Sequence, residues 1–200
     1  WLMSIVTHWF CTLYGWYVFA GMWCTAMVTI MMVTIYLKSK GLLEKVNESH
    51  IHDIGKWVFA TSFLWSYLWF SQFMLYWYSN IPEEVAYYIQ RIEDYNGLFF
   101  GMFMINFIIP MVVLMSRDAK RNANILIFVC LVIFVGHWID VFILVTPGTM
   151  FDHGGISLLE VGMFLMFLGV FIYVILNALT KAPLMPKNHP YLDESLHHEI

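Results

Sequence analysis

Long apolar runs dominate the chain, and short polar segments separate them. A helix needs about 20 apolar residues to cross the hydrocarbon core of a bilayer. Five stretches reach that length, approximately 12–37, 56–79, 97–115, 123–146 and 157–180. None of them alternates apolar and polar residues as a barrel strand does, so the pattern predicts helices throughout. We expect an all-α, polytopic transmembrane helix bundle with five spans.

The polar connections are too short for a soluble domain, so residues 1–180 are expected to form one membrane domain. Residues 181–200 form a polar tail rich in Pro and His, which we expect to pack on a partner subunit rather than to fold alone. The chain starts with Trp1 inside an apolar stretch, without the charged region of a signal peptide. We therefore expect it to be the later part of a longer polypeptide.

Basic residues lie almost entirely on one side of the predicted bundle. Nine Lys and Arg residues occupy the segments 38–56 and 116–122 and the tail, whereas the opposite side has only Arg91. Basic residues near the ends of spans are retained on the cytoplasmic side. We therefore expect the C-terminal tail in the cytoplasm and residue 12 outside.

Composition agrees with a protein embedded in lipid. Hydrophobic residues make up 60% of the 200 residues and charged residues only 12%, whereas about a quarter of the residues in soluble domains are charged. The net charge of −4 and the lack of a basic surface exclude nucleic acid as a partner. Cys11, Cys24 and Cys130 lie far apart inside apolar runs, without metal or redox spacing, and are interpreted as buried apolar residues.

Two outer features have structural explanations. The segment from Ile81 predicts a short interfacial helix, with an apolar stripe of Val85, Tyr88, Ile89 and Ile92 opposite Glu84, Arg91 and Asp94. Gly97 and Gly101 form a GxxxG motif that is expected to permit close helix contact.

Pro110 should kink the third span, where Asn106 is expected to satisfy a freed backbone group or a neighbouring helix.

Ionisable residues inside a membrane are costly and mark functional sites, so their depth decides which ones matter. His137 lies near the middle of the fourth span, and Asp140 lies about one turn closer to the outside. Their i, i+3 spacing places both on one helix face, where the carboxylate can exchange a proton with the imidazole. Asp152 and His153 follow beyond the outer end, and Glu160 lies one turn into the fifth span. We interpret these five residues as a proton-transfer ladder.

Other interpretations of the same residues stay open. His137 and Asp140 alternatively bind the oxygens of a quinol, with Trp138 and Phe142 as an aromatic slot. Ser157 and Glu160 fit the S-x-x-E pattern of a capping box, which gives Glu160 a structural role. A structural alternative is that Asp140 and His137 are buried residues of the bundle whose polar atoms are hydrogen-bonded within it. A haem ligated by His8 and His137 is disfavoured because their depths differ, and no metal site is predicted.

Two further polar groups have structural and functional interpretations. His50, His52, Asp53 and Lys56 are interpreted as an interfacial cap at the start of the second span, with an inner proton mouth as the alternative. Ser62, Ser66, Gln72 and Tyr76 within that span are interpreted as interhelical hydrogen-bonding groups, with a hydrated path as the alternative.

Three segments resemble one known family. They are the run from His52 to Trp57 that enters an aromatic-rich span, the segment from Gly136 to Asp140, and the terminal run from Lys187 to His198. They are similar to the C-terminal half of the ActF family of NrfD-like integral membrane subunits of bacterial alternative complex III. That complex is a quinol:cytochrome c oxidoreductase of the respiratory chain. The likeness covers essentially the whole chain.

The resemblance implies a fold of two helix bundles, of which this chain holds one, in the bacterial inner (plasma) membrane. It implies an NrfD-like sister subunit, an iron–sulfur subunit and cytochrome c subunits as partners, with lipids around the bundle. The iron–sulfur clusters and haem c groups belong to those partners, and a quinone or quinol is the one cofactor considered for this chain.

In this family, polar residues inside the membrane are thought to form a proton route, and His137, Asp140 and Glu160 match that idea. We predict an electron-transport subunit that is not catalytic alone and that carries protons during quinol oxidation. Direct quinol binding and a structural anchor for partner subunits are the two alternatives.

Overall fold

The computed structural model describes residues 1–151, 154–185 and 189–198, and within them it contains helices and no strands. The α-helices are α1 (Tyr14–Ser39), α2 (Glu48–Ser79), α3 (Pro82–Asp94), α4 (Asn96–Phe103), α5 (Ile109–Leu114), α6 (Ala123–Met150), α7 (Leu158–Leu179) and α8 (Leu192–Leu196). A short 3-10 helix, η1 (Met3–Ile5), and a π-helical segment, η2 (Met104–Ile108), complete the described elements. The predicted all-α class is confirmed.

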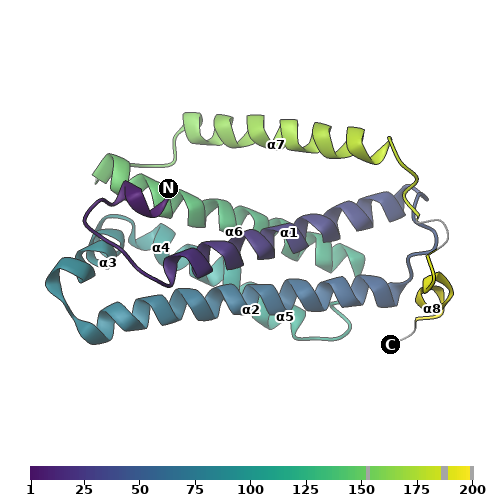
Figure 1. Cartoon of the computed structure of the whole chain (residues 1–200), viewed down its shortest axis with the longest axis horizontal. Coiled ribbons are helices and arrows are strands. Elements are labelled where there is room, and N and C mark those ends of the chain that lie inside the picture. The colour runs from purple at the N-terminus through teal and green to yellow at the C-terminus, as the bar shows by residue number, and fades with distance from the viewer. Residues whose placement is uncertain (152–153, 186–188, 199–200) are drawn as a thin grey trace.

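The long helices run side by side along the longest axis of the molecule (Figure 1). Helix α1 packs on α2 and α6, and the broken helix formed by α4, η2 and α5 packs on α2 and α6. Helix α3 lies at one end of this bundle and α8 at the other, whereas α7 extends along the outside. No residue of α7 is buried, so this helix exposes apolar side chains on every face.

Four helical segments are long and apolar enough to cross a membrane: Tyr14–Ser39, Asn96–Leu114, Ala123–Met150 and Leu158–Leu179. They correspond to the first, third, fourth and fifth predicted spans. The remaining prediction, 56–79, falls within α2, a continuous helix of 32 residues. Helix α2 is less apolar because its buried face carries Thr61, Ser62, Ser66 and Gln72. The structure therefore gives four candidate spans.

Local caps explain where several helices begin and end. Asn47 caps α2, since its side chain accepts a hydrogen bond from the His50 N–H at 2.9 Å, and His50 Nδ1 accepts one from the Asn47 N–H at 3.2 Å. Asn80 ends the same helix in the left-handed conformation, with φ of 47°. Asn122 caps α6, and Ser157 caps α7.

The third predicted span is interrupted by a π-helical turn. Pro110 has no N–H to donate to the carbonyl of Asn106, which weakens the α-helical ladder where η2 lies. Asn106 is fully buried against α6. The expectation that its amide bonds a backbone group or a neighbouring helix is wrong, because neither Oδ1 nor Nδ2 has a hydrogen-bond partner in the described part of the chain.

The close helix contact occurs at a different glycine from the predicted ones. A Cβ added at Gly97 or Gly101 would meet no described atom within 4 Å. Both glycines lie away from the face of α4 that buries Phe99 and Met102. At Gly136 of α6, in contrast, an added Cβ would overlap Asn106 Oδ1 and lie 2.6 Å from a methyl carbon of Ile105. The absence of a side chain at Gly136 is what lets α6 approach η2.

The core has two parts that meet near the middle of the bundle. The first is rich in aromatic residues and includes Trp9, Tyr14, Tyr17, Trp65, Trp69, Tyr76, Tyr87, Tyr88 and Phe99. The second is mainly aliphatic and includes Val28, Met31, Ile35, Val58, Leu126, Val129 and Ile133. Cys11, Cys24 and Cys130 are free and buried, as predicted. On α6, His137 and Asp140 lie between Ile133 of the aliphatic part and Ile143 of the aromatic part.

Candidate functional site

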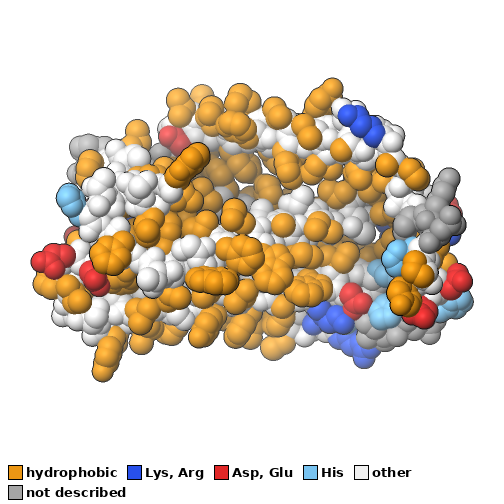
Figure 2. Space-filling model, viewed as in Figure 1, with side chains coloured by type: hydrophobic (Ala, Val, Ile, Leu, Met, Phe, Trp, Pro, Cys, Tyr) orange, Lys and Arg blue, Asp and Glu red, His pale blue; other side chains and the backbone are white. Residues whose placement is uncertain are grey.

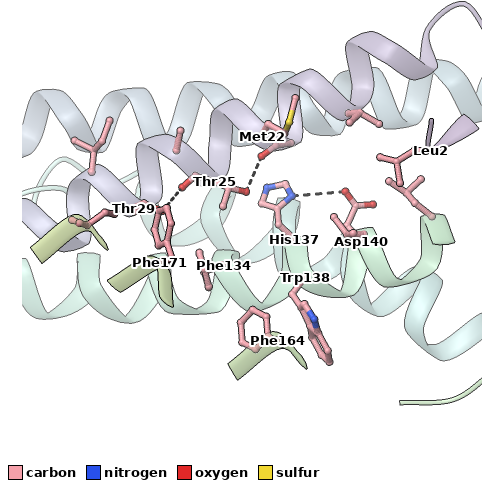
Figure 3. A pocket seen from close by; sticks show the side chains of 17 residues that line it. Leu2, Met22, Thr25, Thr29, Phe134, His137, Trp138, Asp140, Phe164 and Phe171 are labelled. Atoms are coloured by element: carbon pink, nitrogen blue, oxygen red, sulfur yellow. Dashed lines mark hydrogen bonds and ion pairs between the residues drawn. The ribbon is translucent and has the colours of Figure 1, made fainter. Parts of the chain in front are cut away.

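His137 and Asp140 lie on the side of α6 that faces α1 and α2 (Figure 3). Only 5% of His137 and 4% of Asp140 is exposed. His137 Nδ1 lies 3.8 Å from Asp140 Oδ2, which is longer than a hydrogen bond and forms an ion pair only when the imidazole is protonated. The predicted pairing on one helix face is thus present in the fold.

Two neutral donors from two other helices hold the Asp140 carboxylate. The Tyr17 hydroxyl of α1 donates to Oδ1, and the Trp65 indole N–H of α2 donates to Oδ2 at 3.1 Å. Hydrogen bonds from neutral groups stabilise a buried carboxylate without adding a fixed positive charge. Three helices therefore meet at one carboxylate, and sequence analysis identified neither donor.

His137 keeps one ring nitrogen without a partner. Its ring lies edge-on to Trp65, with centroids 5.3 Å apart and an interplanar angle of 88°. Nε2 is buried and has no hydrogen-bond partner among the described residues. A buried imidazole with one free nitrogen beside a carboxylate is able to accept a proton on one side and release it on the other.

Further polar side chains lie on α1 and α2. Cys24 Sγ of α1 and Ser62 Oγ of α2 lie 3.3 Å apart, which confirms an interhelical contact for Ser62. Ser66 instead donates to the Ser62 carbonyl of its own helix, at 2.8 Å. Tyr76 donates to the Phe10 carbonyl at 2.8 Å, and Gln72 Oε1 is buried without a partner in the described part.

A large apolar cavity lies beside the pair. It has a volume of about 720 Å³ and is lined by residues of α1, α6 and α7 together with His137 and Asp140. The ring centroids of Trp138 and Phe164 lie 5.2 Å apart at its wall (Figure 3). Phe142, the other aromatic residue of the predicted slot, is buried in the aromatic part of the core instead. The space suits a hydrocarbon chain with one polar end.

Arg91 is placed differently from the prediction. Sequence analysis assigned it to the polar face of the short outer helix, but it is only 1% exposed. Helix α3 turns Tyr87, Tyr88 and Arg91 toward the bundle, and the Arg91 guanidinium lies 3.4 Å from the centre of the Tyr87 ring. Arg91 Nη1 donates to the Tyr87 carbonyl at 2.9 Å. Burial lowers the pKa of Arg91 from its ordinary value, yet arginine keeps its charge in proteins.

Arg91 and Asp140 line the same small cavity, together with Tyr17 and Gln72. A fixed positive charge therefore lies on the α3 side of the carboxylate. The signal that sequence analysis missed was the position of Tyr87 and Tyr88 one helical turn before the single basic residue of this end, because aromatic rings at that spacing can bury a guanidinium.

Among the described residues, Glu160 of the predicted ladder makes its hydrogen bonds away from the pair. Glu160 closes a capping box, since its carboxylate accepts from the Ser157 N–H at 2.9 Å and from the Ser157 hydroxyl. This is the structural alternative considered for Glu160, and its hydrogen bonds in the described part all go to Ser157 or its own helix start. Asp152 and His153 lie outside the described residues.

The cluster at the start of α2 contacts the C-terminal tail. His198 Nε2 lies 2.9 Å from Asp53 Oδ2, and Lys56 Nζ lies 2.6 Å from Asp53 Oδ1. Burial raises the pKa of Asp53, but hydrogen bonds from Lys56 and His198 outweigh it and lower the pKa below its ordinary value. Burial, reinforced by the Lys56 charge, lowers the pKa of His52. The cluster therefore acts as a cap and as a docking site for the tail.

No three His, Cys, Asp or Glu side chains of the described residues form a metal-binding group, and His8 is exposed whereas His137 is buried. The arrangement around Asp140 contains a buried histidine–aspartate pair, two neutral donors and a fixed cation. Comparison with models of known protein families and with curated proteins finds no match to the chain.

Proposed function

We propose that the chain is part of an integral membrane subunit that transfers protons through His137 and Asp140. The single observation that carries the proposal is the buried Asp140 carboxylate, 4% exposed within a helix that can cross a membrane and bound only by neutral donors besides His137. Burying an ionisable group at such depth is costly, so a purely structural contact would be met more cheaply by an uncharged side chain.

We further propose that the subunit belongs to a quinol:cytochrome c oxidoreductase of the NrfD-like type in the bacterial inner membrane. Support comes from the resemblance carried by residues 52–57, 136–140 and 187–198. The sister subunit, iron–sulfur subunit and cytochrome c subunits are then the partners, and they hold the clusters and haems. The protons move with the electrons that these partners take from quinol.

The proposed topology has five spans, which are the four candidate spans and α2. Helix α2 packs along α1 and runs antiparallel to it through the bundle (Figure 1). Its polar residues Ser62, Ser66 and Gln72 are buried rather than turned to the surrounding medium, as membrane helices require. The basic residues then mark the cytoplasmic end, at the right of Figure 2, and the acidic residues of α3 mark the outer end at the left.

Direct quinol binding at the same pair is a second candidate. The observation that favours it is the apolar cavity of about 720 Å³ beside His137 and Asp140. Against it, both Asp140 oxygens already accept hydrogen bonds, from Tyr17 and from Trp65. A quinol hydroxyl would therefore have to share the carboxylate with these two donors, by using a remaining lone pair.

The test is Asp140→Asn in the purified, reconstituted complex with all subunits and haems retained. Asparagine keeps the size and accepts one hydrogen bond but cannot exchange the proton. We expect turnover or proton release to fall by at least about tenfold, with an unchanged apparent affinity for quinol. A collapse of the affinity supports the quinol site instead. Turnover, proton release and affinity equal to wild type would leave Asp140 as part of a structural anchor.

A further inference from the structure

The small cavity between α1, α2, α3, α4 and α6 gathers unpartnered polar atoms. Gln72 Oε1, Arg91 Nε and Arg91 Nη2 are buried and have no hydrogen-bond partner among the described residues. Gln72, Arg91, Asp140 and Tyr17 all line this cavity, whose volume is about 10 Å³. Gln72 is 3% exposed and Arg91 is 1% exposed. These atoms need a partner that the described residues do not supply.

The size and chemistry of the cavity fit one water molecule. A volume of about 10 Å³ is the space that a single water needs, provided that it finds two to four polar partners. Arg91 offers N–H donors, while Gln72 Oε1 and the Asp140 carboxylate offer acceptors. A cation such as Na⁺ would meet the Arg91 charge, and the cavity is too small for a larger anion.

We propose that this cavity binds a water molecule that links Asp140 to Arg91 and Gln72. The water oxygen accepts a hydrogen bond from Arg91, and its two hydrogens are donated to Gln72 Oε1 and to Asp140. Gln72 Oε1 and one of the two free Arg91 nitrogens then have a hydrogen bond, with three bonds to the water, the usual number for a buried one.

If the proposed function holds, the water also affects proton transfer. It extends the hydrogen-bonded groups from Asp140 toward α3 and hence toward the outer end. The Arg91 guanidinium beside it disfavours an additional positive charge at the water. Arg91 is thus a positioning residue, which orients the water toward the carboxylate.

A structure of the full-length subunit in its native complex, at a resolution that shows ordered waters, tests the proposal. We expect density for one water within about 2.7–3.2 Å of Arg91, Gln72 and Asp140. A dry cavity, or one closed by a neighbouring side chain, overturns the proposal. This readout does not depend on activity.

Two variants on α2 sharpen the test. Gln72→Leu removes the acceptor, so the water density should be lost while the Tyr17–Asp140 hydrogen bond remains. Ser66→Ala is the matched control, because the Ser66 hydroxyl bonds its own helix, and the water should persist. Water retained in Gln72→Leu contradicts the assigned contact.

Failure of the proposed function is distinguishable from failure of the water site. If the water is present but Asp140→Asn leaves turnover and proton release unchanged, the water site stands and the proton route is wrong. If the water is absent and Asp140→Asn stops proton release, the route stands and the water link to Arg91 is wrong.

Discussion

Asp140 is the residue at which the three central helices depend on one another. Its two oxygens bind Tyr17 of α1 and Trp65 of α2, and both donors are nearly fully buried. Such a network is stable only when every member keeps its partner, because a lost donor leaves a buried charge less compensated. The stability of the helix packing and the chemistry of the carboxylate therefore share the same hydrogen bonds.

Tyr17→Phe should destabilise the protein. The change removes the hydroxyl that donates to Asp140 Oδ1 and keeps the ring packing, so we expect a loss of about 1.5–3 kcal/mol, typical of a hydrogen bond to a charged group. Thermal unfolding of the purified complex measures it. Tyr14→Phe is the control, because the Tyr14 hydroxyl makes no hydrogen bond among the described residues. Equal unfolding temperatures for the two variants would contradict the assigned role of Tyr17.

At the residue scale, sequence analysis could place the pair but not its partners. The depth of His137 and Asp140 in the membrane follows from their positions within one helix, and these positions can be counted along the sequence. The approach of Tyr17, Trp65 and Arg91 depends on how three other helices are rotated, which single-helix patterns do not determine. Arg91 was misplaced for this reason, because a charged residue is normally assigned to the polar face.

Gly136 is the position where two elements approach most closely. It lies on α6, one residue before His137, and faces Ile105 and Asn106 of η2. The π-helical turn brings Asn106 against this glycine, so the irregular segment of the third span and the site on α6 are packed together. The orientation of α6, and with it that of the pair, depends on this contact.

Gly136→Ala should therefore disturb the bundle. Its methyl group would overlap Asn106 Oδ1, and overpacking of this kind costs about 1–3 kcal/mol. Gly169→Ala on α7 is the matched control, since a Cβ there meets no described atom within 4 Å and alanine favours a helix over glycine by up to about 1 kcal/mol. Thermal unfolding should separate the two variants in opposite directions. A neutral Gly136→Ala variant would contradict the packing.

At the element scale, the helices themselves were predictable and their irregularities were not. Continuous apolar runs gave four helices long enough to cross a membrane. Helix α2 also forms where a span was expected, but its buried polar face weakens the hydrophobic signal. The interruption near Pro110 was expected as a kink, whereas its π-helical form depends on the packing of Asn106 against α6.

On the scale of the whole molecule, the described part of the tail folds back on the chain. Helix α8 follows the last span, and His50 Nε2 lies 3.0 Å from Ser195 Oγ. Asn47 Nδ2 donates to the His198 carbonyl at 2.8 Å. These contacts fix the tail on the N-terminal cap of α2. From its polar composition, the tail was expected to pack on a partner subunit. A contact between Asp53 and His198, 145 positions apart, leaves no local pattern in the sequence.

Asp53→Asn should loosen the tail. Loss of the carboxylate that binds His198 and Lys56 should speed hydrogen exchange of the amides in Leu192–Leu196, measured by mass spectrometry at fixed pH. The stability change should stay below about 1 kcal/mol, because solvent screens this partly exposed pair. Glu44→Gln removes an equal charge from an exposed residue nearby and should leave the exchange unchanged. Equal exchange in both variants would contradict the docking.

The docking also depends on pH with a defined sign. The pKa of Asp53 in the fold lies below its ordinary value of 3.8. Its stabilising contribution is therefore fully present above about pH 3.8 and is lost as the pH falls through the lower, folded-state pKa. Tail exchange corrected for the intrinsic rate should rise over that acidic interval in wild type. In Asp53→Asn the rise should be absent.

Infrared difference spectroscopy of the reconstituted complex tests directly whether Asp140 exchanges a proton during turnover. On adding quinol, wild type should show a carbonyl band of a protonated carboxylic acid that shifts in D₂O. The band should vanish in Asp140→Asn and persist in Glu160→Gln, because Glu160 closes a capping box. A band that is unchanged in Asp140→Asn, with turnover equal to wild type, would contradict the account.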